Sequence, residues 1–507
     1  MNSFSYLDFG ASEERGEDAK REFISGTTLV GDILKSTLGP KGMVKLLTTG
    51  KEITVTNDGA TILKNLIINS ASAKLIINSS VSQDWEEGDG TTTIAVLTSL
   101  ILEECRKLKI APINIIKGLE LGLDKCIETL DKISETCKEE DLLSLAKTTL
   151  CSKVVRCDLD KFGKLCVDAV QRIKGYSLDR INFVKVAGRL EDSYLEEGFI
   201  LDRDQDINLQ NPKIMIANCT LDADKVKIFS AKIKVNSIKD LSDLEKAEKD
   251  RMKAKIEKMC SYNIDCFINR QLIYDYPSQL FNENGVVPLE HADFDGVERL
   301  ASVLGGKIVS TFDGLDDNSF GTCKEVKNIT IGNKKMVQFS GLKSGACTIV
   351  LKGSSKEVLD EAERSIHDAL CVLKRISTTN KIIYGGGAPE MNMANNLNQY
   401  ALKIEDKESS AVFALSNALE RIPQILAENG GLDGEAIKSK LRSLHTKGKI
   451  TFGVDFDAKD LTCMKTKGVV ESLRIKKRIM RAAVETAQML IKCDAIIKCK
   501  PRERTRH

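Results

Sequence analysis

The sequence lacks the features of a secreted, zinc-binding or membrane-spanning protein. Its 15 cysteines are scattered singly, with no Cys-x-x-Cys pair, and its four histidines lie far apart in the chain. This spacing favours reduced thiols that act as small apolar side chains, so we expect neither a disulfide framework nor a structural zinc site. No apolar run approaches the roughly 18–20 residues that a bilayer span requires.

Two further absences limit the partners and the compartment. The 75 basic and 73 acidic side chains nearly cancel, leaving a formal net charge of +2. Without a long-range field of one sign, DNA, RNA and acidic membrane surfaces are disfavoured as partners. The N-terminal segment has no apolar signal core and soon becomes highly charged, so we expect the chain to stay in the compartment where it is made.

The common signatures of hydrolases are missing as well. The sequence contains no G-x-x-x-x-G-K-[ST] phosphate loop, no H-E-x-x-H zinc-protease motif and no G-x-S-x-G nucleophile motif. A nucleotide site in this protein would therefore differ from the common P-loop.

Helical patterns at both ends of the chain enclose a β-rich middle. Between about residues 181 and 350, short β-branched runs alternate with helical patterns, as in α/β or α+β domains. We therefore predict a helical domain that is split in sequence, with another domain inserted into it. Amphipathic periodicity predicts helices over 22–38, 93–108, 113–133, 359–374, 409–428 and 473–497.

The segment Gly88-Asp89-Gly90-Thr91-Thr92-Thr93 is the sharpest candidate site. Its glycines would let the backbone approach a ligand, and the following N–H groups would lie at the positive end of a helix dipole. Asp89 could hold a hard cation such as Mg²⁺ against phosphate. The same residues also suit an ordinary helix N-cap, and the pattern alone leaves both interpretations open.

Three glycine-containing segments carry weaker signals. Residues 37–42 favour a helix C-cap followed by a turn over a loop that wraps a nucleotide. Asn57-Asp58-Gly59 predicts a hairpin or turn after a short strand at 53–56, with Asp58 as a weak catalytic candidate. Residues 385–387 indicate either a close backbone approach to a ligand or a flexible connection.

Two charged helical segments admit both a structural and a functional interpretation. In 364–370, Asp368 could position an attacking water, but its spacing beside His367 and Arg364 favours a solvated helix face. Residues 240–258 hold 12 charged side chains among 19 positions. That density favours a solvated surface helix, and a projecting arm that packs on another subunit is the alternative.

Taken together, these segments resemble the motif set of the group II chaperonins, in the same order and nearly from end to end. Four further stretches, 192–202, 266–277, 289–301 and 360–373, are most similar to one subunit type of the eukaryotic cytosolic chaperonin. The collinear motifs are STLGPKGM (36–43), NDGATIL (57–63), GDGTTT (88–93), RSIHDAL (364–370), YGGGAPE (384–390) and GVVESLRIKK (468–477).

The resemblance implies a multidomain α+β fold with three domains. A mostly helical equatorial domain that binds ATP would comprise 1–138 and 387–507, and a small α/β intermediate hinge domain 139–204 and 350–386. The α/β apical domain would comprise 205–349 and bind substrate proteins. Its helical protrusion, at about 232–262, would form part of a built-in lid, which favours the projecting-arm interpretation of the charged segment.

The resemblance also implies a role for each candidate residue. Asp58 and Asp368 would orient water for attack on the γ-phosphate of ATP, and Asp89 would bind Mg²⁺. Ser472 departs from the family's usual proline without removing a group needed for hydrolysis, so we expect an active site. The residues expected to contact ATP or ADP are Gly39, Gly90, Thr91, Thr92, Thr93, Ser152, Lys153, Gly386, Glu471 and Lys476.

By the same resemblance, the chain would be an ATP-hydrolysing subunit of a cytoplasmic chaperonin. It would assemble with seven paralogous chaperonin subunits into a hetero-oligomeric double ring and enclose non-native protein clients. No nucleic acid or membrane partner is expected. Two alternatives remain: a structural subunit that binds nucleotide but hydrolyses it weakly, and a homo-oligomeric chaperonin of archaeal type.

Overall fold

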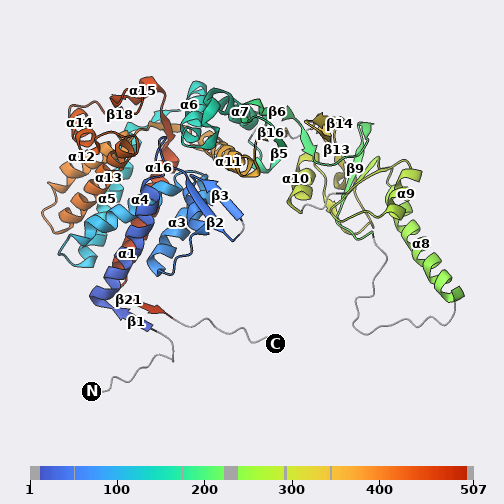
Figure 1. The fold of residues 1–507 in the computed structure, drawn as a ribbon, viewed down its shortest axis with the longest axis horizontal. Helices are drawn as coiled ribbons and strands as arrows, with labels where there is room; N and C mark the ends of the chain where they lie inside the picture. The colour runs from blue at the N-terminus through green and yellow to red at the C-terminus, as the bar shows by residue number, and fades with distance from the viewer. Residues whose placement is uncertain are drawn as a thin grey trace, which may run out of the picture. The chain divides into compact units, whose positions relative to one another are not determined.

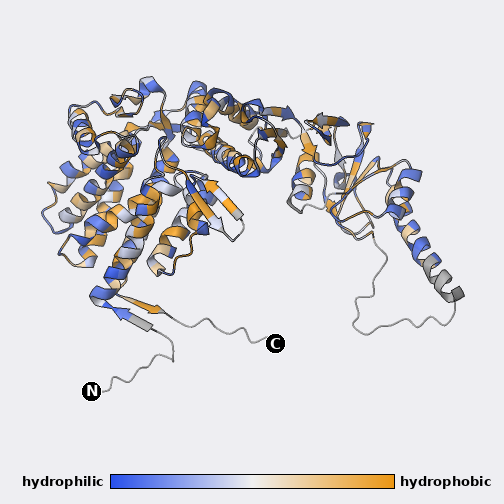
Figure 2. Cartoon of the chain, in the orientation of Figure 1, coloured by the Kyte–Doolittle hydropathy of each residue, from blue (hydrophilic) through white to orange (hydrophobic). Residues whose placement is uncertain are grey.

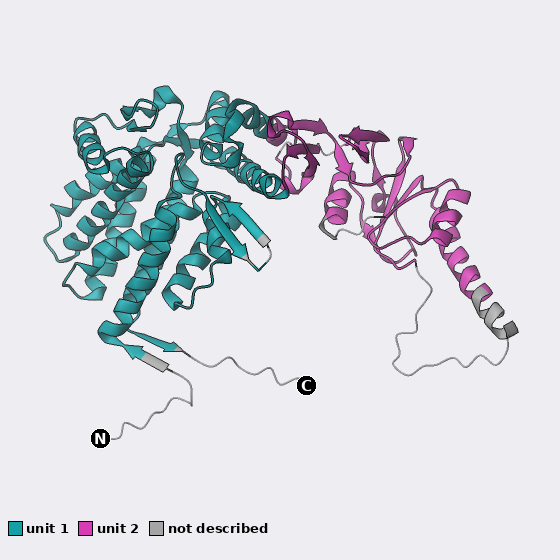
Figure 3. Cartoon of the chain, in the orientation of Figure 1, with its two compact units in different colours: residues 1–167, 356–507 teal, residues 168–355 magenta. Residues whose placement is uncertain are grey.

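The ends of the chain and its middle form separate units. The computed structural model describes residues 12–50, 52–173, 175–221, 238–290, 294–342 and 345–498. Unit 1 combines residues 1–167 with 356–507, and unit 2 comprises 168–355 (Figure 3). The structure is therefore α+β, and it agrees with the prediction of a helical part that is split in sequence around a β-rich middle.

Unit 1 consists mainly of long helices (Figure 1). Its most buried helix is α4 (Thr91–Arg106), in which every residue from 94 to 102 is buried. A helix that is apolar on all sides requires neighbours on all sides, and α1, α3, α13 and α16 pack against it. The other helices are α1 (Gly16–Lys35), α2 (Gly59–Asn65), α3 (Ala71–Glu87), α5 (Pro112–Ile133), α6 (Glu139–Leu150), α11 (Lys356–Thr379), α12 (Ala388–Ala401), α13 (Glu408–Asn429), α14 (Gly434–Thr446), α15 (Met464–Lys467) and α16 (Leu473–Lys492), while α7 (Leu159–Arg172) continues into unit 2.

Short antiparallel sheets connect the helices of unit 1. Each joins segments that are either adjacent or very distant in sequence, and one pairs the two ends of the described chain. The pairs are β1 (Ser12–Arg15) with β21 (Ala495–Lys498), β2 (Lys45–Thr49) with β3 (Glu52–Thr56), and β18 (Phe452–Asp455) with β19 (Asp460–Cys463), and a three-stranded sheet has the order β20 (Val470–Ser472), β17 (Lys381–Tyr384), β4 (Glu135–Thr136).

The described residues of unit 2 form three sheets and the helices that cover them. One sheet has the order β11-β10-β9-β12, all parallel, with β13 antiparallel to β9. The second has the antiparallel order β7-β15-β14-β8, and the third is mixed, with the order β5-β16-β6. The elements are β5 (Ile181–Ala187), β6 (Tyr194–Glu197), β7 (Phe199–Leu201), β8 (Asn208–Gln210), β9 (Lys213–Ala217), α8 (Ile238–Cys260), β10 (Cys266–Asn269), α9 (Asp275–Glu283), β11 (Val287–Glu290), α10 (Phe294–Leu304), β12 (Ile308–Val309), β13 (Gly321–Thr322), β14 (Glu325–Ile331), β15 (Lys334–Ser340) and β16 (Cys347–Gly353).

The charged segment predicted as a surface helix or arm is part of α8. Figure 2 shows much of its described length as hydrophilic, and residues 246–251 are exposed. Near its C-terminal end, Ile256 and Met259 are buried in an apolar cluster of unit 2. One end of this helix is therefore anchored in unit 2. The first part of the predicted protrusion, up to residue 237, lies outside the described residues.

The predicted helix 473–497 is too long at its C-terminal end. α16 ends at Lys492, and residues 495–498 form β21, which pairs with β1 over four residues. Helical periodicity continues through this segment, but backbone hydrogen bonds to a strand more than 470 residues earlier determine its conformation. The predicted strand at 53–56 is present as β3, in a hairpin with β2.

The division into equatorial, intermediate and apical domains remains a prediction, because the two units do not test its boundaries. Among the described residues, no helix is long and apolar enough to cross a membrane.

His445 stabilises the turn that leads into β18. It is buried in α14, and its Nε2 lies 2.8 Å from the carbonyl oxygen of Phe452, to which it can donate a hydrogen bond. Burial lowers the pKa of His445 below its ordinary value of 6.5, although the bond to Phe452 opposes this shift. The folded chain therefore holds this side chain neutral.

This burial predicts a loss of stability in mild acid. Above pH 6.5 the side chain is neutral in both the folded and the unfolded chain, so it contributes no pH dependence. As the pH falls from 6.5 towards the lower folded-state pKa, only the unfolded chain gains the proton, and unfolding becomes more favourable. We expect His445→Gln to reduce the difference in thermal unfolding midpoint between about pH 7.5 and about pH 5.5 by a few degrees. His367→Gln, at an exposed histidine of α11, is the control; an equal reduction in both variants would contradict the assignment to His445.

Candidate functional site

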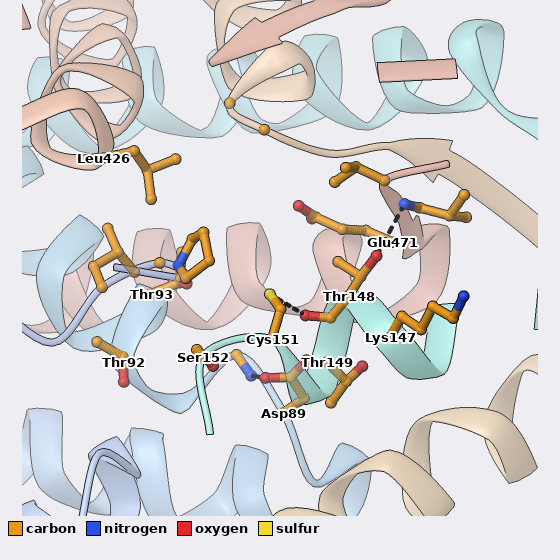
Figure 4. A pocket seen from close by; sticks show the side chains of 18 of the residues that line it. Asp89, Thr92, Thr93, Lys147, Thr148, Thr149, Cys151, Ser152, Leu426 and Glu471 are labelled. Atoms are coloured by element: carbon orange, nitrogen blue, oxygen red, sulfur yellow. Dashed lines mark hydrogen bonds between the residues drawn. The ribbon is translucent and has the colours of Figure 1, made fainter. Parts of the chain in front are cut away.

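A pocket of about 600 Å³ in unit 1 collects the predicted site residues from distant parts of the chain. Figure 4 shows side chains from four of its segments, including Asp89, Thr92, Ser152 and Glu471. Asp368 does not line the pocket but contacts Lys153, which does. The predicted residues that line it are Gly39, Asp58, Asp89, Gly90, Thr91, Thr92, Thr93, Ser152, Lys153, Gly386, Glu471 and Lys476.

The segment 88–93 forms a tight loop at the N-terminus of α4. Gly90 is the N-cap residue with φ +84°, a conformation that favours glycine, and a Cβ there would lie 2.5 Å from Ile479. The N–H of Gly90 donates to Asp89 Oδ1 at 2.6 Å. The first N–H groups of a helix have no carbonyl partner within it, so this loop presents donors to an anion. It is both an N-cap and a candidate phosphate site.

Polar side chains of α3, which the sequence did not single out, hold this loop from behind. Ser80 donates to the carbonyl oxygen of Thr91 at 3.0 Å, and Gln83 donates to that of Asp89 at 2.9 Å. Both side chains are buried. Two polar residues three positions apart lie on one face of a helix, but nothing in the sequence indicates that this face is buried.

Asp58 caps α2 and faces the same loop. The predicted turn at Asn57-Asp58-Gly59 is therefore a helix N-terminus, and the hairpin turn lies earlier, between β2 and β3. The carboxylate of Asp58 accepts from the N–H groups of Ala60 and Thr61, from Thr61 Oγ1 at 2.7 Å and from Thr91 Oγ1 at 3.2 Å. Burial acts to raise the pKa of Asp58, but the charge of Lys153 and these hydrogen bonds lower it overall.

Lys153 joins Asp58 and Asp89 to Asp368. Its Nζ lies 2.9 Å from Asp368 Oδ2, and both side chains are about 10% exposed. Burial opposes the charge on Lys153, yet the carboxylates of Asp368, Asp58 and Asp89 raise its pKa above the ordinary value. Burial also raises the pKa of Asp368 well above its usual range, against the attraction of Lys153. The preference for a solvated face at Asp368 was wrong, because this residue is buried against the 151–153 segment.

The acidic side chains in this region make it a candidate cation site. Asp58 and Asp89 line the same pocket as Lys153, which pairs with Asp368. Burial raises the pKa of Asp89, although the charges of Lys153 and Lys476 oppose that shift. Among the described residues, no group of three or more His, Cys, Asp or Glu side chains forms a complete metal site. Mg²⁺ commonly binds through one or two carboxylates together with substrate phosphates and water, and Asp89 beside the α4 N-terminus fits that pattern.

A second buried lysine orients Glu471 on the other side of the pocket. Lys476 Nζ lies 2.6 Å from Glu471 Oε2 and 2.7 Å from Glu390 Oε1. Burial raises the pKa of Glu471, and the charge of Lys476 opposes this. Glu390, in the first turn of α12, was not predicted as a site residue. Its other oxygen is buried without a hydrogen-bond partner among the described residues.

The glycines after β17 have a fixed conformation. Gly386 has φ +70°, and its carbonyl oxygen accepts from the N–H of Val454 at 2.9 Å. A Cβ on Gly386 would lie 2.7 Å from the sulfur of Met464. This close approach contradicts a flexible connection and places backbone directly in the pocket wall. The 37–42 segment likewise follows the end of α1 and lines the pocket, so it is both a helix end and part of the site.

Comparison with known proteins identifies relatives along the whole chain. Residues 30–501 match the model of the TCP-1/cpn60 chaperonin family. T-complex protein 1 subunit beta of Encephalitozoon cuniculi is 55% identical, with all of both chains covered. The proteins of that name from Saccharomyces cerevisiae and Homo sapiens are 45% and 44% identical; 98% of this chain is covered in both, with 98% and 96% of the relatives. These matches confirm the resemblance predicted from the motifs and the similarity to one eukaryotic subunit type.

The buried ion pair at the centre of the site predicts a specific pattern of stability. Lys153→Met should leave Asp368 buried without its cation and lower the free energy of unfolding by about 3–5 kcal/mol. Adding Asp368→Asn should recover part of this loss, because the carboxylate that pairs directly with Lys153 is then neutral. Denaturant titration of the full chain measures both effects.

Lys132→Met is the matched control for Lys153→Met, since Lys132 pairs with Glu128 on the exposed surface of α5. An exposed pair contributes little to stability, because water and salt screen both charges. Equal stability of the two single variants, or a double variant no more stable than Lys153→Met, would show that Lys153 does not balance a buried charge.

Proposed function

The chain belongs to the TCP-1/cpn60 chaperonin family, and we propose that it is an ATP-hydrolysing subunit of a cytoplasmic chaperonin. In this function, Mg-ATP hydrolysis drives the enclosure and folding of non-native proteins in a double-ring chamber with a built-in lid. The observation that carries the proposal is the convergence of Asp58, Asp89 and Asp368 around Lys153, beside the N-terminus of α4.

Each side of the pocket supports one part of nucleotide binding. The N–H groups and hydroxyls of Thr91, Thr92 and Thr93 suit the phosphates. On the opposite wall, Glu471 is oriented by Lys476 and suits the ribose hydroxyls, while the backbone at Gly386 allows close approach of ribose and base. Gly39 and Ser152 line the same space and complete the proposed binding set.

The chain's own contribution to hydrolysis is position and charge. A bound Mg²⁺ neutralises phosphate charge during phosphoryl transfer, and Asp89 is the residue that would hold it. The environments of Asp58 and Asp368 shift their pKa values in opposite directions, downwards and upwards respectively. Asp368 is therefore the stronger base and suits acceptance of a proton from the attacking water, whereas Asp58 stays ionised and orients that water.

The two alternative functions make different predictions about this chain. A subunit that only binds nucleotide has no need of a complete hydrolytic set, and the three aspartates and Lys153 are all present. A homo-oligomeric chaperonin of archaeal type is disfavoured because the eukaryotic relatives carry the name of one subunit, beta. We accordingly favour a hetero-oligomeric ring with seven paralogous subunits, and mass spectrometry of the purified particle would distinguish one subunit species from eight.

An exposed apolar face on the β2–β3 hairpin supports assembly. Leu46 lies opposite Val55 in the hairpin register, and Ile53 lies on the same face. Their exposed fractions are 65%, 37% and 54%, and Figure 2 shows hydrophobic segments in both strands. A two-stranded sheet that exposes apolar side chains is a typical site of contact with another chain. This hairpin therefore suits a contact with a neighbouring subunit.

Asp368→Asn tests hydrolysis. The amide keeps the shape of the side chain but is a poor base, so we expect ATP turnover by this chain to fall about 100-fold or more. Electron microscopy of the particle frozen during ATP turnover should show ATP in the variant pocket and ADP in the parent. Glu357→Gln, at an exposed residue in the first turn of the same helix, should leave turnover unchanged. ADP in the Asp368→Asn pocket at the parent level would overturn the hydrolytic role.

A pair of charges on the hairpin tests assembly. Leu46→Asp with Val55→Asp should remove the chain from the particle, because the charges would have to be buried in the contact. Native mass spectrometry measures incorporation, and circular dichroism of the free chain measures its folding. Leu402→Asp, at an exposed leucine after α12, is the control. Normal incorporation of the hairpin variant would exclude this face from the assembly contact.

A further inference from the structure

Asn57, immediately before Asp58, connects three segments of unit 1. Its side-chain Nδ2 donates to the carbonyl oxygen of Ser152 at 2.9 Å. Its backbone N–H donates to Glu361 Oε1 across 3.5 Å. The turn that carries Asp58 is thereby tied both to the segment that carries Lys153 and to α11, the helix that carries Asp368.

Glu361 is a buried acid on α11 that the mechanism above does not use. Its side chain is only 2% exposed, and its Oε1 accepts from the N–H of Asn57. Its Oε2 lies 3.5 Å from Arg364 Nη1 and has no hydrogen-bond partner among the described residues. Burial raises the pKa of Glu361, against the charges of Lys153 and Arg364. Burying a carboxyl group in this position lowers the stability of the folded chain, which indicates a functional role for Glu361.

The spacing of Glu361 and Asp368 explains how one helix serves both contacts. Seven residues correspond to about two helical turns, so both side chains leave α11 on the same face. Asp368 contacts Lys153 from that face, and Glu361 contacts the turn at Asn57. Together with the bond from Asn57 to Ser152, these contacts form a closed circuit through the three segments.

The circuit joins the segments that carry the two proposed hydrolytic carboxylates. If the contact between Glu361 and Asn57 were lost, the only remaining link of this circuit to α11 would be the pair between Lys153 and Asp368. Lys153 also interacts with Asp58 and Asp89. A second attachment restricts rotation of the helix relative to the Asp58 turn. Small errors in the distance between these carboxylates are costly, because misplacement by about 1 Å can lower a rate about 100-fold.

We propose that Glu361 and Asn57 are positioning residues for ATP hydrolysis. They hold the Asp58 turn against α11 so that Asp58 and Asp368 face the same water. Glu361 is not among the residues that line the pocket, and it acts through Asn57 and Asp58. This inference rests on the proposed function, since it concerns the geometry of that same site.

The test uses the assembled particle with changes in this chain alone. The share of ATP turnover that Asp368→Asn removes defines this chain's contribution. Glu361→Ala should remove about nine-tenths or more of that share, because the turn loses its attachment to α11. Glu361→Gln keeps an oxygen that can accept from the N–H of Asn57, so it should retain most of the share. Glu357→Ala, exposed on the same helix, is the matched control.

Two further measurements separate positioning from a purely structural role. Nucleotide occupancy of this chain's pocket, seen by electron microscopy, should be unchanged in Glu361→Ala, with ATP in place of ADP. In the Asp368→Asn background, adding Glu361→Ala should lower turnover little further, because residues that act as a unit are not additive. Loss of occupancy, or a Glu361→Gln variant as inactive as Glu361→Ala, would overturn the inference.

The failures of the two proposals are distinguishable. If Asp368→Asn leaves turnover and nucleotide state unchanged, the proposed hydrolytic function itself fails. If Asp368→Asn lowers turnover but Glu361→Ala does not, hydrolysis stands and only the positioning role of Glu361 and Asn57 is wrong. Asn57→Ala should also lower this chain's share of turnover, because it removes the bond to Ser152 from the same circuit.

Discussion

The interaction on which the site depends is the charge balance around Lys153. One buried ammonium attracts Asp58 from the start of α2, Asp89 from the loop before α4 and Asp368 from α11. These carboxylates would repel one another if Lys153 were absent, and each is costly to bury alone. The ammonium therefore holds together three segments that approach from different directions. Asp89, which lines the pocket beside the α4 N-terminus, is the carboxylate that suits a divalent cation bound with phosphate.

The rest of unit 1 serves to keep this arrangement in register. α4 is buried along most of its length, which fixes the position of its N-terminus and hence of the Gly90 loop. Ser80 and Gln83 hold the loop's carbonyl oxygens from α3, so its N–H groups are directed towards the pocket. Lys476 restrains Glu471 through a second buried pair. Two buried lysines that line the pocket, Lys153 and Lys476, thus each pair with an acid.

The residues of the central ion pair lie close in sequence to the two points where the chain passes from one unit to the other. α11 carries Asp368 and Glu361 and begins where unit 2 ends in sequence, at residues 355 and 356. Ser152 and Lys153 precede α7, which continues into unit 2 at residue 168. Both chain crossings between the units therefore lie close in sequence to residues of the hydrolytic set. A proposed cycle of binding and hydrolysis has a direct covalent route to the part of the chain expected to meet client proteins.

The sequence by itself determined the helical ends and β-rich middle, the family and many of the residues that line the pocket, because these follow from local periodicity and from collinear motifs. It could not determine which helix faces are buried. The local pattern of Asp368 and His367 predicted a solvated helix face, but packing buries Asp368 against Lys153. The pattern around Asn57 predicted a hairpin or turn, but the residue precedes the start of α2. Residues 495–498 continue a helical pattern, but pairing with the distant strand β1 makes them a strand. Glu361, Gln83 and Glu390 carry no local signal, because their roles come only from the segments that tertiary structure brings against them.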